Sequence, residues 1–296
     1  MTDLPVHEQS TLNDTTRWNI IKRKASETRI SQAFFLFRSH AIEPILIKGI
    51  AADLYYPRSE LRDSVDMDIA VASKDFEAAS SINASADAQG LAIDLHCELR
   101  HLDTLPWDEL VERSQTVTFE SGTIRVLSPE DHLRVLCTHW LTDGGANKSR
   151  LWDIYYLIKN RPADFEWERF LSVVEPKRRR WLTCTIGLAE RFLGLDLSGT
   201  PVHKVSDELP AWLIKTVEAE WADNVPLRGL YTSIDDPQMF LKQLKKRLPP
   251  NPISSTVLMN GSFDAKTRIF YQIGTSLQRI GPAVVNLSKS LLRRSK

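Results

Sequence analysis

Cysteine is scarce in this chain of 296 residues, which contains only Cys97, Cys137 and Cys184. The three lie far apart and form no Cys-x-x-Cys pair. The spacing therefore excludes a disulfide framework and a thiolate zinc site. We interpret the three residues as buried thiols in a reducing compartment.

A surplus of charge of one sign is also missing. The chain has 38 Lys and Arg against 38 Asp and Glu, and its formal net charge is +0. Nucleic-acid binders usually carry an excess of Lys and Arg, so the composition does not favour a large nucleic-acid partner.

Long apolar runs are absent as well, since no segment reaches the roughly 18 apolar residues that a membrane-spanning helix needs. The first residues, MTDLPVHEQSTLNDTTRW, have no apolar core and carry acidic residues early, unlike a secretory signal. We therefore expect a cytoplasmic protein.

The C-terminal segment, residues 279–296, is basic and amphipathic. Such a segment can lie weakly on an anionic membrane surface. The alternative, which the sequence favours, is that it packs on the rest of the protein or frays.

Apolar spacing divides the chain into a mixed first part and a helical second part. Ile30, Phe34 and Phe37 recur at helical spacing in a helix expected over residues 15–40. Alternation and turn residues then predict strands and helices in the following order: a strand at 45–49, helical turns up to Pro57, a strand at 66–73, a helix at 74–90 closed by Gly90, a strand at 91–99, and a hairpin at 116–128.

From Ser128 onward the pattern is helical. Ser128 is a good N-cap, Pro129 suits the first helical position, and Asp131 places an acid in the first turn. We therefore expect an α+β protein, with a small mixed β-sheet core and flanking helices in residues 1–127 and a mostly helical domain in residues 128–296.

Two carboxylates stand together in the segment ELRDSVDMDIAVAS. Asp66 and Asp68 are two residues apart, so in a strand they point to the same face. Asp94 lies in the next predicted strand, where an acid between Ile93 and Leu95 is unfavourable unless something compensates its charge. If three carboxylates on neighbouring strands share Mg²⁺ ions, the ions compensate their negative charges. The alternative is a solvated turn, because a pair of aspartates alone is a weak pattern.

The order of these segments resembles that of the uncharacterised bacterial nucleotidyltransferase family, within the DNA polymerase beta-like nucleotidyltransferase superfamily. The resemblance covers about residues 44–159. The segments that carry it are ILIKGIAADLYYP, LRDSVDMDIAV, AIDLHCEL, LSPEDHLRVLCTHWLTDG and SRLWDIYYLI.

This resemblance implies a metal-dependent transfer of a nucleoside monophosphate from a nucleoside triphosphate (NTP) to an acceptor. It assigns Mg²⁺ or Mn²⁺ to Asp66, Asp68 and Asp94, with Asp94 also a candidate general base. Lys48 and Gly49 stand where the superfamily usually has Gly-Ser at a helix entrance, so they are candidate triphosphate contacts.

Arg62 matches the arginine that precedes the acidic pair in the family, which makes it another candidate phosphate contact. Its alternative is an ion pair with Asp63 or Glu60. The family tends to have a small polar residue before the first acid, where this chain has Val65.

Two further residues are candidates for nucleotide or phosphate binding. His96 shares a strand face with Asp94 and can orient a carboxylate or touch substrate, and a structural histidine is the alternative. Lys148 lies in the polar segment HWLTDGGANKSRLWD, which can hold base, ribose or phosphate or can simply join two helices.

The sequence therefore predicts a transferase that uses an NTP donor. The acceptor is open: a small molecule, a sugar phosphate, a protein or an RNA, with nucleic acid less favoured by the neutral charge. The alternative is a catalytically silent protein of the same fold that binds a nucleotide or a partner. The presence of Asp66, Asp68 and Asp94 favours the enzyme.

Overall fold

The structure is a computed structural model that describes residues 6–57, 60, 62, 67–99, 105–223 and 236–279, with side chains from Arg17 onward. The predictions for Asp63, Asp66 and residues 280–296 lie outside the described residues.

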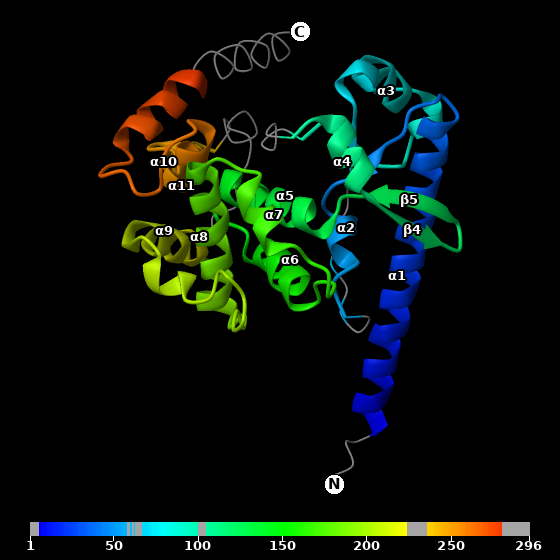
Figure 1. Cartoon of the computed structure of the whole chain (residues 1–296), viewed down its shortest axis with the longest axis horizontal. Coiled ribbons are helices and arrows are strands. Elements are labelled where there is room, and N and C mark those ends of the chain that lie inside the picture. The colour runs from blue at the N-terminus through cyan, green and yellow to red at the C-terminus, as the bar shows by residue number, and fades with distance from the viewer. Residues whose placement is uncertain are drawn as a thin grey trace. The chain divides into compact units, whose positions relative to one another are not determined.

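Helices and strands alternate in the first part of the chain, and helices alone follow (Figure 1). The first part contains α1 (Val6–Arg38), β1 (Ile45–Leu46), α2 (Ile50–Asp53), β2 (Met67–Val71), η1 (Ser73–Asp75), α3 (Phe76–Asn83), η2 (Ala86–Ala88), β3 (Ile93–Cys97), α4 (Trp107–Arg113), β4 (Gln115–Phe119) and β5 (Gly122–Val126). The second part contains α5 (Pro129–Thr142), α6 (Lys148–Lys159), α7 (Trp167–Ser172), α8 (Pro176–Leu193), η3 (Val205–Glu208), α9 (Ala211–Ala222), α10 (Pro237–Arg247), α11 (Pro252–Leu258) and a helix at 269–279.

The chain forms two compact units. The first contains Met1–Leu136 and Asp153–Val173, and the second contains Cys137–Trp152 and Val174–Lys296. The predicted division of the sequence at residue 127 stays a prediction.

The first unit is built on a five-stranded sheet with the order β3-β2-β1-β5-β4. Strand β2 pairs in parallel with β3 and antiparallel with β1, while β5 pairs in parallel with β1 and antiparallel with β4. The predicted α+β fold with a small mixed sheet, flanking helices and a helical C-terminal part is confirmed.

Alternation along β2 separates its apolar side chains from its acid. Met67, Ile69 and Val71 enter a core cluster with residues of α1, among them Phe34 and Phe37. The intervening Ala70 belongs to a second cluster on the opposite face. Because strand side chains alternate, Asp68 shares the face of Ala70. The buried strand therefore holds the Asp68 carboxylate on a rigid backbone.

Some local predictions are wrong. The predicted helix at 74–90 ends at Asn83, not at Gly90, because Ala84 is its C-cap and Ser85 is extended. All three cysteines are free, but Cys97 is exposed while Cys137 and Cys184 are buried. Cys97 shares a strand face with Ile93 and Leu95, so alternation alone predicts burial; it is instead the last residue of β3, an edge strand of the sheet, and is exposed there.

The sequence has no apolar run long enough to predict a membrane-spanning helix. Within the described ranges, every helix is too short or too polar to cross a bilayer.

Candidate metal centre

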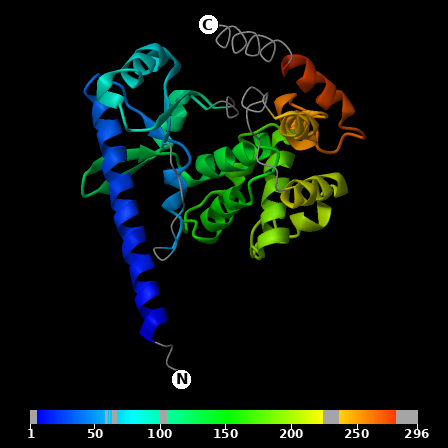
Figure 2. The ribbon, with the colours of Figure 1, turned by 180° about the vertical axis from the view of Figure 1, so that it is seen from behind.

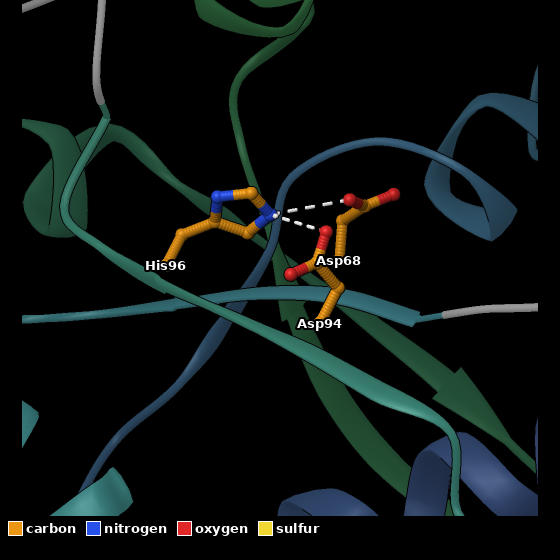
Figure 3. A group of neighbouring side chains, drawn as sticks. All are labelled: Asp68, Asp94 and His96. Carbon is orange, nitrogen blue, oxygen red and sulfur yellow. Dashed lines mark hydrogen bonds and ion pairs between the residues drawn. The ribbon is translucent and has the colours of Figure 1, made fainter. Parts of the chain in front are cut away.

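Two neighbouring parallel strands carry the acidic residues of the site. Asp68 of β2 is in register with Asp94 of β3, and His96 follows two residues later on β3 (Figure 3). Residues two apart in a strand share a face, so Asp94 and His96 point to the same side. Ile93 and Leu95 pack instead against the apolar core cluster.

The three side chains converge on the imidazole of His96. Its Nε2 lies 3.2 Å from Oδ1 of Asp68 and 3.3 Å from Oδ2 of Asp94. One ligand atom from each residue lies within 4.8 Å of the others. In Figure 3 both carboxylates approach the same ring nitrogen. The sheet register therefore assembles a compact set of two carboxylates and one imidazole.

Lys48 also contacts the buried carboxylate. Its Nζ lies 2.7 Å from Oδ1 of Asp68, and both side chains are largely buried. Burial raises the pKa of Asp68, but the hydrogen bonds and charges of His96 and Lys48 outweigh it and lower the pKa to about 2. Asp68 is therefore ionised at neutral pH.

Gly49 turns the chain directly after Lys48. Its φ of 62° with ψ of −116° is a conformation that glycine adopts without the Cβ clash of other residues. This turn begins the short helix α2. Lys48 is thereby positioned beside Asp68, while its predicted contact with a triphosphate stays a prediction.

The donor set fits a divalent cation. Asp68 is 7% exposed and charged, whereas the side chain of Asp94 is 52% exposed. A fixed carboxylate beside an accessible one suits an ion that takes oxygen ligands and keeps positions for water and phosphate. An imidazole beside them also suits Mn²⁺ and other transition metals.

Arg62 is held by an acid far along the chain. Its Nε and Nη2 donate to the two oxygens of Asp153, at 2.7 and 2.8 Å, and the hydroxyl of Tyr56 donates to Oδ1 at 2.7 Å. The alternative pair with Glu60 is wrong, since the Glu60 carboxylate accepts from Tyr156. Asp63, the other alternative partner, lies outside the described residues.

The charge of Arg62 remains within electrostatic reach of the site. Burial lowers the pKa of Arg62, but hydrogen bonds and charge from Asp153, with a smaller contribution from Asp68, raise it overall. Arg62 is therefore a fixed positive charge near the acids, and its phosphate contact stays a prediction.

The polar segment around Lys148 belongs mainly to the second unit. There Arg150 contacts His139 at 2.8 Å and also Asp143, and the ammonium of Lys148 lies 5.1 Å from the centre of the Trp221 ring. Asp153 contributes instead to the first unit, where it holds Arg62. The nucleotide contact of Lys148 stays a prediction.

A buried histidine near Arg62 predicts a pH dependence of stability. His132 of α5 is fully buried, 5.6 Å from the Tyr55 ring between centroids, and its Nε2 has no hydrogen-bond partner among the described residues. Burial, helped by the charge of Arg62, lowers the pKa of His132 to about 3. Between pH 6.5 and about 3 the unfolded chain binds a proton that the folded one does not.

We expect the buried, neutral His132 to lower the free energy of unfolding by about 1.4 kcal/mol for each pH unit below 6.5. Denaturant unfolding at pH 7, 6 and 5 checks this, because His132→Leu should lose that part of the slope. His40→Leu, which changes an exposed histidine, should keep it. Equal slopes in wild type and His132→Leu would contradict the assignment.

The sheet and its acidic site define the chain as an α+β protein with a carboxylate-rich candidate metal centre. Residues 81–194 match the model of a family described as uncharacterised nucleotidyltransferase. The predicted resemblance to a nucleotidyltransferase family is thereby confirmed over this segment; its bacterial origin stays a prediction. The match includes Asp94 and His96, whereas Asp68 precedes it. No curated protein and no solved structure matches the chain.

Sequence reasoning left the role of His96 open between orienting a carboxylate and touching substrate, and the imidazole lies between both carboxylates. It missed Asp153 as the partner of Arg62, for which the local sequence holds no signal because the two residues are 91 positions apart.

Proposed function

We propose that the protein is a metal-dependent nucleotidyltransferase that moves a nucleoside monophosphate from an NTP to an acceptor hydroxyl. The family match supports nucleotidyl transfer as the general activity. The observation that carries the finer proposal is the register of Asp68 and Asp94, which brings a buried, ionised carboxylate and an accessible one to the same imidazole.

The proposal assigns one or two tasks to each residue of the site. Asp68 and Asp94 hold Mg²⁺ or Mn²⁺, with His96 and the predicted ligand Asp66 beside them. When bound, the ion supplies charge neutralisation for the triphosphate and for the leaving pyrophosphate. Lys48 and His96 fix the Asp68 carboxylate in one orientation, so the site needs little rearrangement.

Asp94 is the proposed general base. Its side chain is the more accessible of the two carboxylates, so it can meet an acceptor hydroxyl and take its proton. Lys48 at the Gly49 turn and the fixed guanidinium of Arg62 supply positive charge for the phosphate groups.

The competing function is a catalytically silent protein that binds a nucleotide. One observation favours it: Lys48 and His96 already compensate the charge of Asp68. A site of this kind is stable without an ion, whereas three unpaired carboxylates are not.

Label transfer separates the two functions. The protein is incubated with each NTP, labelled at either the α- or the γ-phosphate, with Mg²⁺ or Mn²⁺ and a cell extract. Transfer of a nucleoside monophosphate predicts that the α-label enters an acceptor, that the γ-label leaves as pyrophosphate, and that a chelator abolishes both. NTP binding without transfer of the α-label from any of the four nucleotides would support the silent protein.

A further inference from the structure

The helix at 269–279 turns apolar side chains to solvent. Ile269, Phe270, Ile273 and Leu277 are 59%, 74%, 52% and 66% exposed. On a helix of 3.6 residues per turn these positions fall within an arc of about 100°. They form one continuous apolar stripe, which we call the C-terminal stripe (on the red helix in Figures 1 and 2).

The opposite face of this helix is anchored in the second unit. Gln272 donates to the carbonyl of Pro250 at 2.7 Å, and Thr275 is buried. The Tyr271 ring lies so close to Gly261 that a Cβ there would come within 2.5 Å of it. Rotating the helix to bury the stripe would break these contacts, so the stripe is held outward by packing.

All charged residues in the surrounding sequence are basic. Residues 266–296 contain seven of the chain's 38 Lys and Arg and none of its 38 Asp and Glu. Lys266 and Arg279 flank the described helix and are exposed, whereas Arg268 is buried and donates to the carbonyls of Ser262 and Ala265. Lys289, Arg293, Arg294 and Lys296 lie outside the described residues. In a chain of neutral net charge, such segregation attracts a negatively charged partner.

A second copy of the chain fits this surface poorly. A two-fold interface would bring the same basic segment against itself, and like charges repel. The stripe also has only four side chains, whereas a standard protein interface uses roughly 20–30 residues on each side. Apolar side chains bordered by Lys and Arg are instead the pattern of helices that lie in the interface of an anionic bilayer.

We propose that the C-terminal stripe docks the protein on an anionic lipid surface. Phe270 and its apolar neighbours enter the boundary between headgroups and acyl chains, while Lys266 and Arg279 contact the headgroups. This attachment is peripheral, and it does not depend on the proposed nucleotidyl transfer.

Vesicle sedimentation of the full chain tests the proposal. The vesicles contain equal parts phosphatidylserine and phosphatidylcholine, or phosphatidylcholine alone. We expect at least about tenfold more bound protein on the anionic vesicles, and less as salt is raised. Phe270→Ser with Ile273→Ser should lower binding to anionic vesicles by about tenfold or more.

A matched control lies on α1. Phe35 and Ile20 are 76% and 51% exposed, almost the same as Phe270 and Ile273. Phe35→Ser with Ile20→Ser should therefore keep vesicle binding. Circular dichroism melts of both double variants check that each remains folded.

Three results would overturn the proposal. The wild type could fail to sediment with anionic vesicles, or both double variants could lose binding equally. The third is a wild-type dimer in light scattering that Phe270→Ser with Ile273→Ser converts to a monomer without any lipid binding. That result would assign the stripe to a second copy of the chain.

Discussion

Asp68→Asn is expected to reduce nucleotidyl transfer by about a hundredfold to a thousandfold, the usual loss when one preorganised electrostatic group is removed. Asn keeps the shape of Asp but has no charge. The variant therefore keeps its place in the buried strand β2 while losing the negative charge that a metal ion requires. Lys48 and His96 would then lack their charged partner.

Two measurements distinguish a loss of metal binding from a loss of folding. Binding of Mn²⁺, followed by its paramagnetic resonance signal, should weaken in Asp68→Asn and in Asp94→Asn. Circular dichroism should show both variants folded. Asp108→Asn, at an exposed acid of α4, is the control and should retain transfer. Full transfer of the α-label by Asp68→Asn would refute the assignment of this residue as a metal ligand.

Asp153→Ala is expected to lower the free energy of unfolding by about 3–5 kcal/mol, the cost of removing one partner of a buried ion pair. Asp153 is 2% exposed and accepts two hydrogen bonds from Arg62 and one from Tyr56. Its removal leaves a largely buried guanidinium without its counter-charge and a phenol without its acceptor.

A double variant distinguishes the loss of a partner from the loss of packing. Asp153→Leu with Arg62→Met removes both charges and keeps apolar volume, so it should cost less than Asp153→Ala. Denaturant unfolding of the three proteins measures the difference. If the double variant is the less stable one, the cost comes from the cavity or from Tyr56, not from the unpaired charge of Arg62.

Local alternation made the acidic site partly predictable. Strand side chains have a period of two, so Ile93 and Leu95 facing the core implies that Asp94 and His96 share the other face. The pairing of Asp68 with Asp94 required one further piece of information, namely that β2 and β3 are adjacent and in this register. A shift of one residue would have turned one acid toward the core.

Contacts over long separations were not predictable in this way. Nothing near Arg62 indicates Asp153, because the pair joins two segments of the first unit that are 91 positions apart in the chain. The end of α3 at Asn83 was also missed. Alanine and serine residues beyond it suit a helix by propensity, but the chain there takes a short 3₁₀ turn before β3.

The sequence by itself determined the α+β class, the order of strands and helices, the nucleotidyltransferase resemblance and the face shared by Asp94 and His96. The class, the element order and the shared face follow from periodicities and turn residues that act over a few positions, whereas the resemblance rests on the order of the quoted segments. Only the tertiary structure decided that His96 joins both carboxylates, that Asp153 holds Arg62, and that the C-terminal stripe faces outward. The physical reason is that strand register and helix rotation are set by packing between distant segments, which local spacing does not encode.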